Sequence, residues 1–265
     1  GLQVENLTSQ YFWDQMDCVD LPALGAIEED LTRKVVAELG LELDTLFYDT
    51  TNFFTYIAAT NPKPKLARRG HSKQKRADLR LFGLALLVSR DGQIPLYSQV
   101  YEGNRTDVKV FPESLSRIRE RLGRLSLELK DVTLVYDKGN NSRKNMAAVD
   151  QAEIGYVASL VPSHFKDLMA LPLSQYRPLR EGRLAGTPVL RLTREIWGRE
   201  RTVLLTVSEQ LRAGQIRGLE QHLQKRLRDL KAWQEELSKL NSSLHRLETA
   251  QKRIDTLLAG QHLQE

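Results

Sequence analysis

Two aspartates occupy positions where a carboxylate is unusual. Asp49 interrupts an apolar and aromatic run over residues 45–56, and Asp137 ends the apolar run over residues 132–136. A carboxylate on a buried strand costs desolvation free energy unless a cation or hydrogen bonds compensate it. A divalent metal ion is one such compensation, because Mg2+ prefers oxygen ligands and commonly takes one or two carboxylates together with waters and phosphate oxygens.

The two aspartates, taken as a pair, predict phosphoryl-transfer chemistry. If they end adjacent strands, Asp49 and Asp137 can share metal ions that activate a water or hydroxyl and stabilise the leaving oxygen of an in-line displacement. Each residue alone also has a structural interpretation. Asp49 can bond to nearby backbone at a strand end, and Asp137 can open the turn signalled by Lys138-Gly139-Asn140. Their joint placement beside a basic loop favours the metal site.

Cations cluster next to both aspartates. Residues 61–80 hold eight Lys and Arg against the single acid Asp78. Clustered cations favour a polyanion partner such as nucleic acid. The alternative is a solvated charged loop. Because phosphate contacts are independent of base sequence, such residues position DNA without recognising it. The predicted DNA-binding residues are Lys63, Lys65, Arg68, Arg69, Lys73, Lys75, Arg76, Lys138, Arg143 and Lys144.

Composition bounds the class of protein. The chain has 265 residues, which is enough for one substantial core with a small appendage. Its net charge is +5. With Cys18 as its only cysteine it has no intrachain disulfide, which fits a cytoplasmic protein. No apolar run approaches the roughly 20 residues of a membrane helix, so no membrane is expected as a partner.

The elements that must position the aspartates follow from hydrophobic periodicity. Apolar, β-branched and aromatic runs predict strands, and Asp91-Gly92 predicts a hairpin turn between the second and third of them. Ser142 is the candidate N-cap of a helix predicted over residues 141–151. The expected strands span 45–56, 79–89, 94–101, 132–137 and 156–161, and the helices between them span 108–122 and 141–151. This order predicts an α/β fold with a mixed sheet flanked by helices.

Four segments are expected along the chain. Three- and four-residue apolar steps predict helix over residues 11–40, with Gly40 as a stop. Apolar residues from Leu230 to Leu258 form a late stripe typical of a coiled coil or helical hairpin, for which dimerisation and intramolecular packing both stay open. The expected segments are an N-terminal helical segment 1–40, a core 41–161, a β-rich insertion 162–207 and a long helical segment 208–265.

The start of the helix over 108–122 allows two interpretations. Asn104 and Asp107 can support the metal site by contacting and orienting the residues that bind the metal. Alternatively, Thr106 or Asp107 is the N-cap, which fits the capping preference and is the interpretation we favour for Asp107.

Four sequence blocks carry a resemblance to a known family. Tyr48-Asp49-Thr50-Thr51-Asn52 resembles the segment of the first catalytic aspartate in DDE transposases of the IS-four superfamily. Residues 81–92 and 101–107 resemble its next block, and residues 135–142 resemble the block around the second aspartate. The branch that the chain looks closest to is that of the IS-sixteen-thirty-four elements.

The resemblance implies both a fold and an activity. It implies an RNase H-like fold, interrupted after the second aspartate by a β-rich insertion that matches residues 162–207. It implies hydrolysis at insertion-sequence ends with Mg2+ or Mn2+, followed by attack of the freed 3′-hydroxyl on target DNA, often by a dimer. Asp49 and Asp137 then inherit the first two catalytic, metal-binding carboxylates.

The chain departs from the family at its third carboxylate. The family places a glutamate on a late helix, in a motif that begins with Tyr and Arg. Tyr176 is followed by Arg177 and Arg180, but Leu184 stands where the glutamate belongs. We therefore expect the chain to stop before that glutamate and, alone, to bind metal weakly and cleave poorly. An RNase H-like nuclease and a degenerate, non-catalytic DNA-binding relic remain the alternatives.

Overall fold

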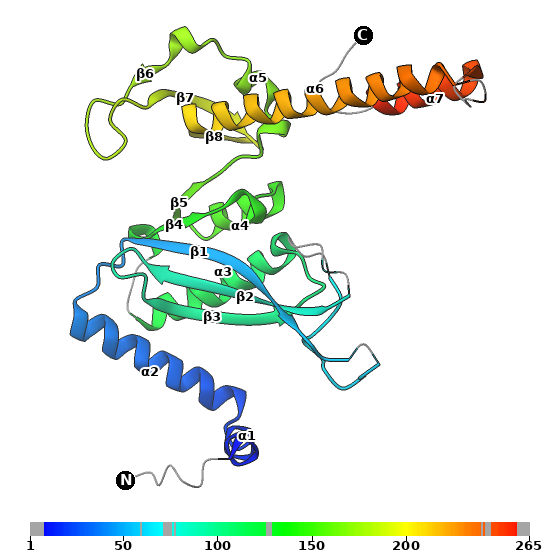
Figure 1. The fold of residues 1–265 in the computed structure, drawn as a ribbon. Coiled ribbons are helices and arrows are strands. Elements are labelled where there is room, and N and C mark those ends of the chain that lie inside the picture. The colour runs from blue at the N-terminus through cyan, green and yellow to red at the C-terminus, as the bar shows by residue number, and fades with distance from the viewer. Residues whose placement is uncertain are drawn as a thin grey trace. The chain divides into compact units, whose positions relative to one another are not determined.

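The computed structural model describes residues 8–58, 60–70, 76, 78–125, 129–239, 241 and 245–258 (Figure 1). The chain divides into two compact units, residues 1–169 and 170–265, and each is described by itself. The finer division into four segments expected from the sequence stays a prediction.

A five-stranded mixed sheet organises the first unit, in the order β3-β2-β1-β4-β5. β1, β2 and β3 form an antiparallel meander, whereas β4 runs parallel to β1 and β5 runs parallel to β4. The turn between β2 and β3 holds Gly92 and Gln93 at φ 66° and 52°, which fits the predicted hairpin. The strands are β1 Thr45–Thr55, β2 Arg80–Ser89, β3 Pro95–Glu102, β4 Thr133–Tyr136 and β5 Gly155–Ala158.

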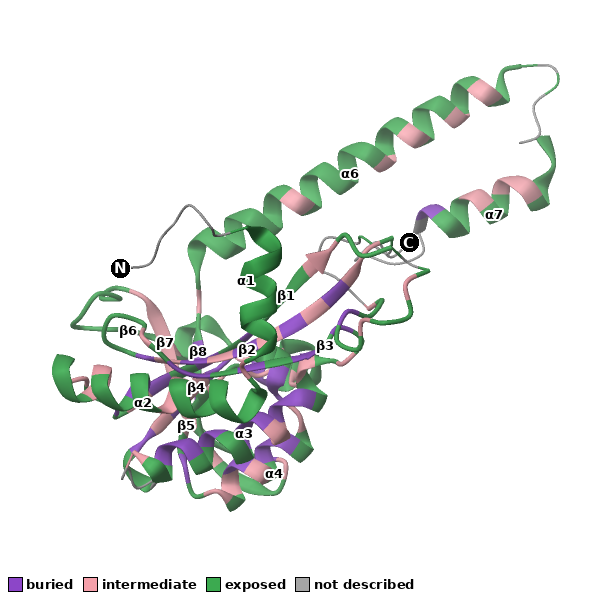
Figure 2. Cartoon of the chain, turned by 90° about the horizontal axis from the view of Figure 1, so that it is seen from below, coloured by how far each residue is buried: buried purple, intermediate pink, exposed green. Residues whose placement is uncertain are grey.

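One face of this sheet forms the core. It is covered by α3 (Asp107–Arg124) and α4 (Arg143–Gln151), as the buried positions in Figure 2 show. The rings of Tyr48 and Tyr136 contact Phe111 of α3, with centroids 5.3 and 4.8 Å apart. These aromatic contacts join the two tyrosines that directly precede the candidate aspartates, on β1 and β4, to one helix.

The predicted helix over residues 11–40 is two helices, α1 (Ser9–Asp17) and α2 (Leu21–Leu39). The chain breaks at Asp20, whose side chain accepts a hydrogen bond from the backbone N–H of Ala23 and so caps α2. Gly40 ends α2 at φ 57°, as expected. The apolar stripe of α2 is largely exposed, because the helix contacts the sheet through polar residues such as Glu28 instead.

Several short elements complete the two units. Residues 129–131 and 138–140 are the 3-10 turns η2 and η3, and η4 (Pro162–His164) and α5 (Lys166–Met169) end the first unit. The second unit begins with η5 (Leu173–Gln175) and holds a small antiparallel sheet of β6 (Arg177–Pro178), β7 (Pro188–Ile196) and β8 (Arg199–Thr206). Two helices follow, α6 (Glu209–Leu237) and α7 (Leu247–Leu258), so the continuous late helical pattern is divided between two helices.

The predicted fold class is confirmed: a mixed sheet flanked by helices, a second β-rich region and a long late helix. After the antiparallel meander, β1 pairs in parallel with β4, and β4 in turn pairs in parallel with β5 at the sheet edge. Among the described helices, none combines the length and apolar character needed to cross a bilayer.

Candidate metal and nucleic-acid site

The register between β1 and β4 brings the two candidate aspartates together. Tyr48 is paired with Tyr136 across the parallel strands, and Asp49 and Asp137 are the next residues of each chain segment. Asp137 keeps extended backbone, with φ −81° and ψ 163°. Side chains alternate between the two faces of a sheet, and neighbouring strands lie about 4.8 Å apart. Both carboxylates therefore lie side by side on the face opposite the buried tyrosines.

This second face of the sheet is only partly covered. Phe47, Val100 and Val157 are 40%, 49% and 59% exposed, and Asp49 and Asp137 are themselves exposed. The expectation that the carboxylates are buried was therefore wrong: the faces of the sheet are unequal, and the aspartates are on the open one. Desolvation does not require a metal here, but an exposed pair of carboxylates is accessible to a metal ion and to a substrate phosphate.

Asp49 also makes a local contact. Its Oδ1 accepts a hydrogen bond of 2.8 Å from the backbone N–H of Thr50. This is the backbone contact that the structural interpretation of Asp49 predicts. Because a carboxylate can accept about four hydrogen bonds or metal contacts, one backbone contact fixes the side chain without excluding a metal.

The segment after Asp137 is held by asparagines. The side-chain amide of Asn145 donates to the carbonyl oxygens of Asn140 and Val108, at 2.7 and 3.0 Å. Asn141 donates to the carbonyl oxygen of Ser159, and Ser142 caps α4 as predicted by accepting from the backbone N–H of Asn145. These bonds anchor both the turn after Asp137 and the start of α4. This role was not predicted from the sequence, although the asparagine-rich run of residues 140–145 is its visible signal.

Asp107 is not the N-cap of α3. Thr106 occupies that position, and Asp107 lies in the first turn, where its Oδ1 accepts from the hydroxyl of Tyr101 at 3.1 Å. A Cβ placed on Gly139, two residues after Asp137, would lie 3.8 Å from Asp107 Oδ2. Asp107 thus borders the turn after Asp137, but the described residues contain no cluster of three or more acidic, histidine or cysteine ligands.

The donor set fits a hard divalent cation in part. Two carboxylates on neighbouring strands are the protein share that Mg2+ often takes, and substrate phosphate oxygens and waters supply the rest. Mn2+ has the same preference for oxygen ligands. The described part of the chain therefore offers two carboxylates of the kind that such a centre uses, Asp49 and Asp137, without a group of three or more metal-ligating side chains.

The predicted DNA-binding residues fall into two groups. Lys138, Arg143 and Lys144 are exposed directly after Asp137. Lys63, Lys65, Arg68 and Arg69 are also exposed, but they lie beyond the end of β1. Since a strand rises about 3.3 Å per residue, Asp49 and Thr55 are already about 20 Å apart. The loop therefore lies one strand segment away from Asp49 rather than next to it.

The loop that carries Lys63, Lys65, Arg68 and Arg69 is anchored to the sheet. Arg68 and Leu81 exchange backbone hydrogen bonds of 3.0 and 2.8 Å, and the backbone N–H of Gly103 donates to Leu66. A Cβ on Gly70 would lie 2.0 Å from the carbonyl oxygen of Gly103, so the close approach needs glycine. Arg76 is paired with Asp78 through two hydrogen bonds, which lower the pKa of Asp78 to about 2. Lys73 and Lys75 lie outside the described residues.

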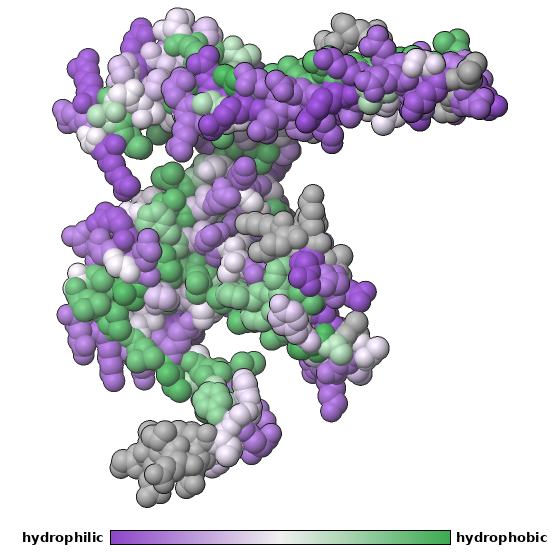
Figure 3. All heavy atoms as spheres, in the orientation of Figure 1, coloured by the Kyte–Doolittle hydropathy of each residue, from purple (hydrophilic) through white to green (hydrophobic). Residues whose placement is uncertain are grey.

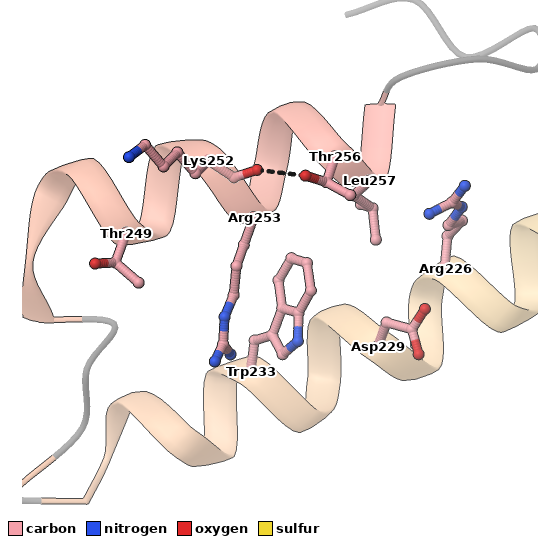
Figure 4. A pocket seen from close by; sticks show the side chains of 8 residues that line it. All are labelled: Arg226, Asp229, Trp233, Thr249, Lys252, Arg253, Thr256 and Leu257. Carbon is pink, nitrogen blue, oxygen red and sulfur yellow. Dashed lines mark hydrogen bonds between the residues drawn. The ribbon is translucent and has the colours of Figure 1, made fainter.

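A pocket of about 380 Å³ lies in the second unit, between α6 and α7 (Figure 4). Arg253 stands 5.8 Å from the ring centroid of Trp233 and donates to Glu236 at 2.8 Å, so the pocket is part of the contact between the two helices. It contains neither candidate aspartate, and the chemistry proposed for Asp49 and Asp137 does not use it.

Comparisons with known proteins give partial likenesses. No protein-family model matches the chain, and no curated protein matches it. A Mos1 transposase paired-end complex with left transposon end has a TM-score of 0.32 at 12% identity, over 51% of this chain and 41% of that chain. The Mos1 transposase catalytic domain with Raltegravir and Mn has a TM-score of 0.30 at 9% identity, over 49% and 56%.

A viral assembly shows the same level of likeness. The simian T-cell lymphotropic virus intasome in complex with PP2A regulatory subunit B56 gamma has a TM-score of 0.28 at 17% identity, over 51% of this chain and 45% of that chain. The present chain thus spans about half the length of the solved chains that it resembles. The case for function therefore comes from the geometry of Asp49 and Asp137.

Proposed function

We propose that this chain is the greater part of a DNA transposase catalytic domain, which cleaves strands at insertion-sequence ends and transfers them to target DNA with Mg2+ or Mn2+. The observation that carries the proposal is the parallel pairing of Tyr48 with Tyr136, which brings Asp49 and Asp137 to one face on adjacent strands. The sequence blocks around both aspartates support the IS-four superfamily and its IS-sixteen-thirty-four branch.

Each part of the site has a distinct task. Asp49 and Asp137 hold the metal, and the asparagine bonds of Asn140, Asn141 and Asn145 fix the backbone after Asp137. A bound divalent metal supplies activation of the attacking oxygen and stabilisation of the leaving oxygen. Lys138, Arg143 and Lys144 contact the phosphates that flank the scissile bond, because Lys138 follows Asp137 directly, Arg143 and Lys144 begin α4, and all three are exposed.

The more distant cations hold the same DNA farther along. Lys63, Lys65, Arg68 and Arg69 lie in the loop beyond Thr55, and Thr55 is about 20 Å from Asp49 along the strand. One strand of duplex DNA advances about 3.4 Å per nucleotide. These cations therefore reach phosphates about six nucleotides from the site of chemistry, and they add affinity without base specificity.

The remaining proposals concern organisation. Residues 162–207 are the β-rich insertion of the catalytic fold, and they contain the small sheet of β6, β7 and β8. A homodimer through the late helices would place two such sites on paired ends. Both proposals follow from the family resemblance.

Titration with Mn2+ tests the proposed site on the full 265-residue chain, with the free-ion signal followed by electron paramagnetic resonance. Asp49→Asn and Asp137→Asn are each expected to weaken binding strongly, while circular dichroism stays native. Asp131→Asn is the matched control, because Asp131 is an exposed aspartate at the opposite end of β4. Unchanged binding in both site variants would reject the assignment.

A further inference from the structure

The net positive charge of the chain comes from its second unit. Residues 170–265 hold 17 Lys and Arg against 11 Asp and Glu, whereas residues 1–169 hold 22 against 23. The unit that contains the candidate aspartates is thus almost neutral. A positive excess on one part of a protein raises the local potential there and attracts polyanions. The second unit is therefore expected to contribute strongly to the electrostatic attraction for DNA.

Helix α6 arranges part of this charge on one face. At about 100° per residue, Arg217, Lys225, Arg228 and Lys231 fall within an arc of about 120°. All four are exposed. The two acids of the same stretch, Glu220 and Asp229, fall outside the arc. From Arg217 to Lys231 the helix rises about 21 Å, so these cations form a basic strip as long as about six nucleotide steps of one DNA strand.

Two other sides of α6 differ from the basic strip: one contacts α7, and one is apolar. Trp233 and Asp229 point toward α7 in Figure 4, and the bond from Arg253 to Glu236 joins the two helices. Ile216, Leu223 and Leu230 form an apolar stripe on a side of the helix turned away from the basic strip. In Figure 3, α6 is hydrophilic over most of its visible length. Its contact with α7 thus leaves the basic strip uncovered.

We propose that the basic strip of α6, formed by Arg217, Lys225, Arg228 and Lys231, binds the phosphate backbone of duplex DNA. The identity of the polyanion rests on the proposed function, but the contact itself needs neither a metal nor the aspartates. Lys and Arg side chains on a stiff helix neutralise phosphates without reading bases. The strip therefore adds sequence-independent affinity for transposon or target DNA from the second unit of the chain.

The test is a salt-dependent binding measurement on the full chain. Fluorescence anisotropy of a labelled duplex of about 30 base pairs and arbitrary sequence is recorded in EDTA at several KCl concentrations. Each neutralised phosphate contributes about −0.9 to the slope of log K against log[salt]. The triple variant Lys225→Gln/Arg228→Gln/Lys231→Gln is expected to weaken binding and to make the slope shallower by about 2.7.

A matched control separates the strip from bulk charge. Lys34→Gln/Arg119→Gln/Lys166→Gln removes the same charge from exposed positions of the first unit and is expected to keep the parental slope. Equal slopes in the two triple variants would overturn the proposal. A changed sedimentation coefficient in the strip variant would also overturn it, because the residues would then serve contacts between copies of the chain. Because EDTA removes metal, these outcomes are independent of those for Asp49 and Asp137.

Discussion

The hydroxyl of Tyr48 donates to Ser114 Oγ at 3.0 Å and ties the strand that carries Asp49 to helix α3. Ser114 donates in turn to Gln99 Oε1, which also accepts from the hydroxyl of Tyr97. Tyr48 and Ser114 are both buried. The residue before the candidate metal ligand is thus fixed by a polar network in the core.

Removing either end of the bond should destabilise the protein unequally. Ser114→Ala leaves the buried Tyr48 hydroxyl without its acceptor and is expected to cost about 2 kcal/mol. Tyr48→Phe removes the donor while Ser114 keeps Gln99, so about 1 kcal/mol is expected. Urea unfolding of both variants gives the comparison. A greater loss in Tyr48→Phe would show that the hydroxyl bond is not the main contribution of this pair.

The buried tyrosines predict a loss of stability at high pH. Burial raises the pKa of Tyr97 to about 12 and raises the pKa values of Tyr48 and Tyr101 well above the ordinary value of 10. Their contribution is fully present below about pH 10 and declines as the pH rises toward 12, because the unfolded chain ionises first. Absorbance at 295 nm should show these tyrosines ionising together with loss of circular dichroism. Complete titration near pH 10 in a native chain would refute this.

Gly83 on β2 is required by the ring of Tyr101. A Cβ at this position would lie 2.1 Å from ring atoms of Tyr101, a buried side chain that also donates to Asp107. Gly83→Ala should therefore destabilise the fold by about 1–3 kcal/mol. Gly123→Ala is the control, since nothing lies within 4 Å of a Cβ there. This helical site should gain about 0.5–1 kcal/mol. Similar unfolding midpoints for the two variants would contradict the close packing of Tyr101.

Glu28 joins α2 to the sheet and to α3. Its carboxylate accepts from Ser98 Oγ at 2.7 Å and from Arg121 at 2.9 Å. Because Arg121 is buried, Glu28→Gln leaves its charge poorly compensated. We expect a loss of about 2 kcal/mol, below the range for fully buried pairs, since the Glu28 side chain is one-third exposed. Asp30→Asn, in an exposed pair with Arg33, should change the unfolding free energy by less than about 0.5 kcal/mol. Equal effects of the two substitutions would argue against this anchoring role.

Local patterns predicted the elements of the first unit well. The strand around Asp49 and the turn at Gly92 follow from side-chain alternation and turn chemistry, which act over a few residues. The cap at Ser142 is equally local. The break of the first helix at Asp20 was missed because the apolar stripe begins after it, and the stripe was extended back over residues that form a separate helix.

The site depends on contacts that local patterns do not encode. The pairing of Tyr48 with Tyr136 joins strands that lie nearly ninety positions apart, so sequence could suggest but not establish that Asp49 and Asp137 meet. The exposure of both aspartates depends on which sheet face α3 covers, and strand alternation alone does not decide that. The amide contacts of Asn145 likewise join residues from separate elements.

Sharing of one metal centre by Asp49 and Asp137 is tested most directly by a double-variant cycle in the Mn2+ titration. Asp49→Asn, Asp137→Asn and the double variant are compared with the parent chain at Mn2+ concentrations high enough to measure residual binding. Ligands of one centre should be strongly coupled, so the double variant should lose little more affinity than either single variant. Losses of free energy that add within about 0.5 kcal/mol would show that the two carboxylates act independently, and would contradict the shared site.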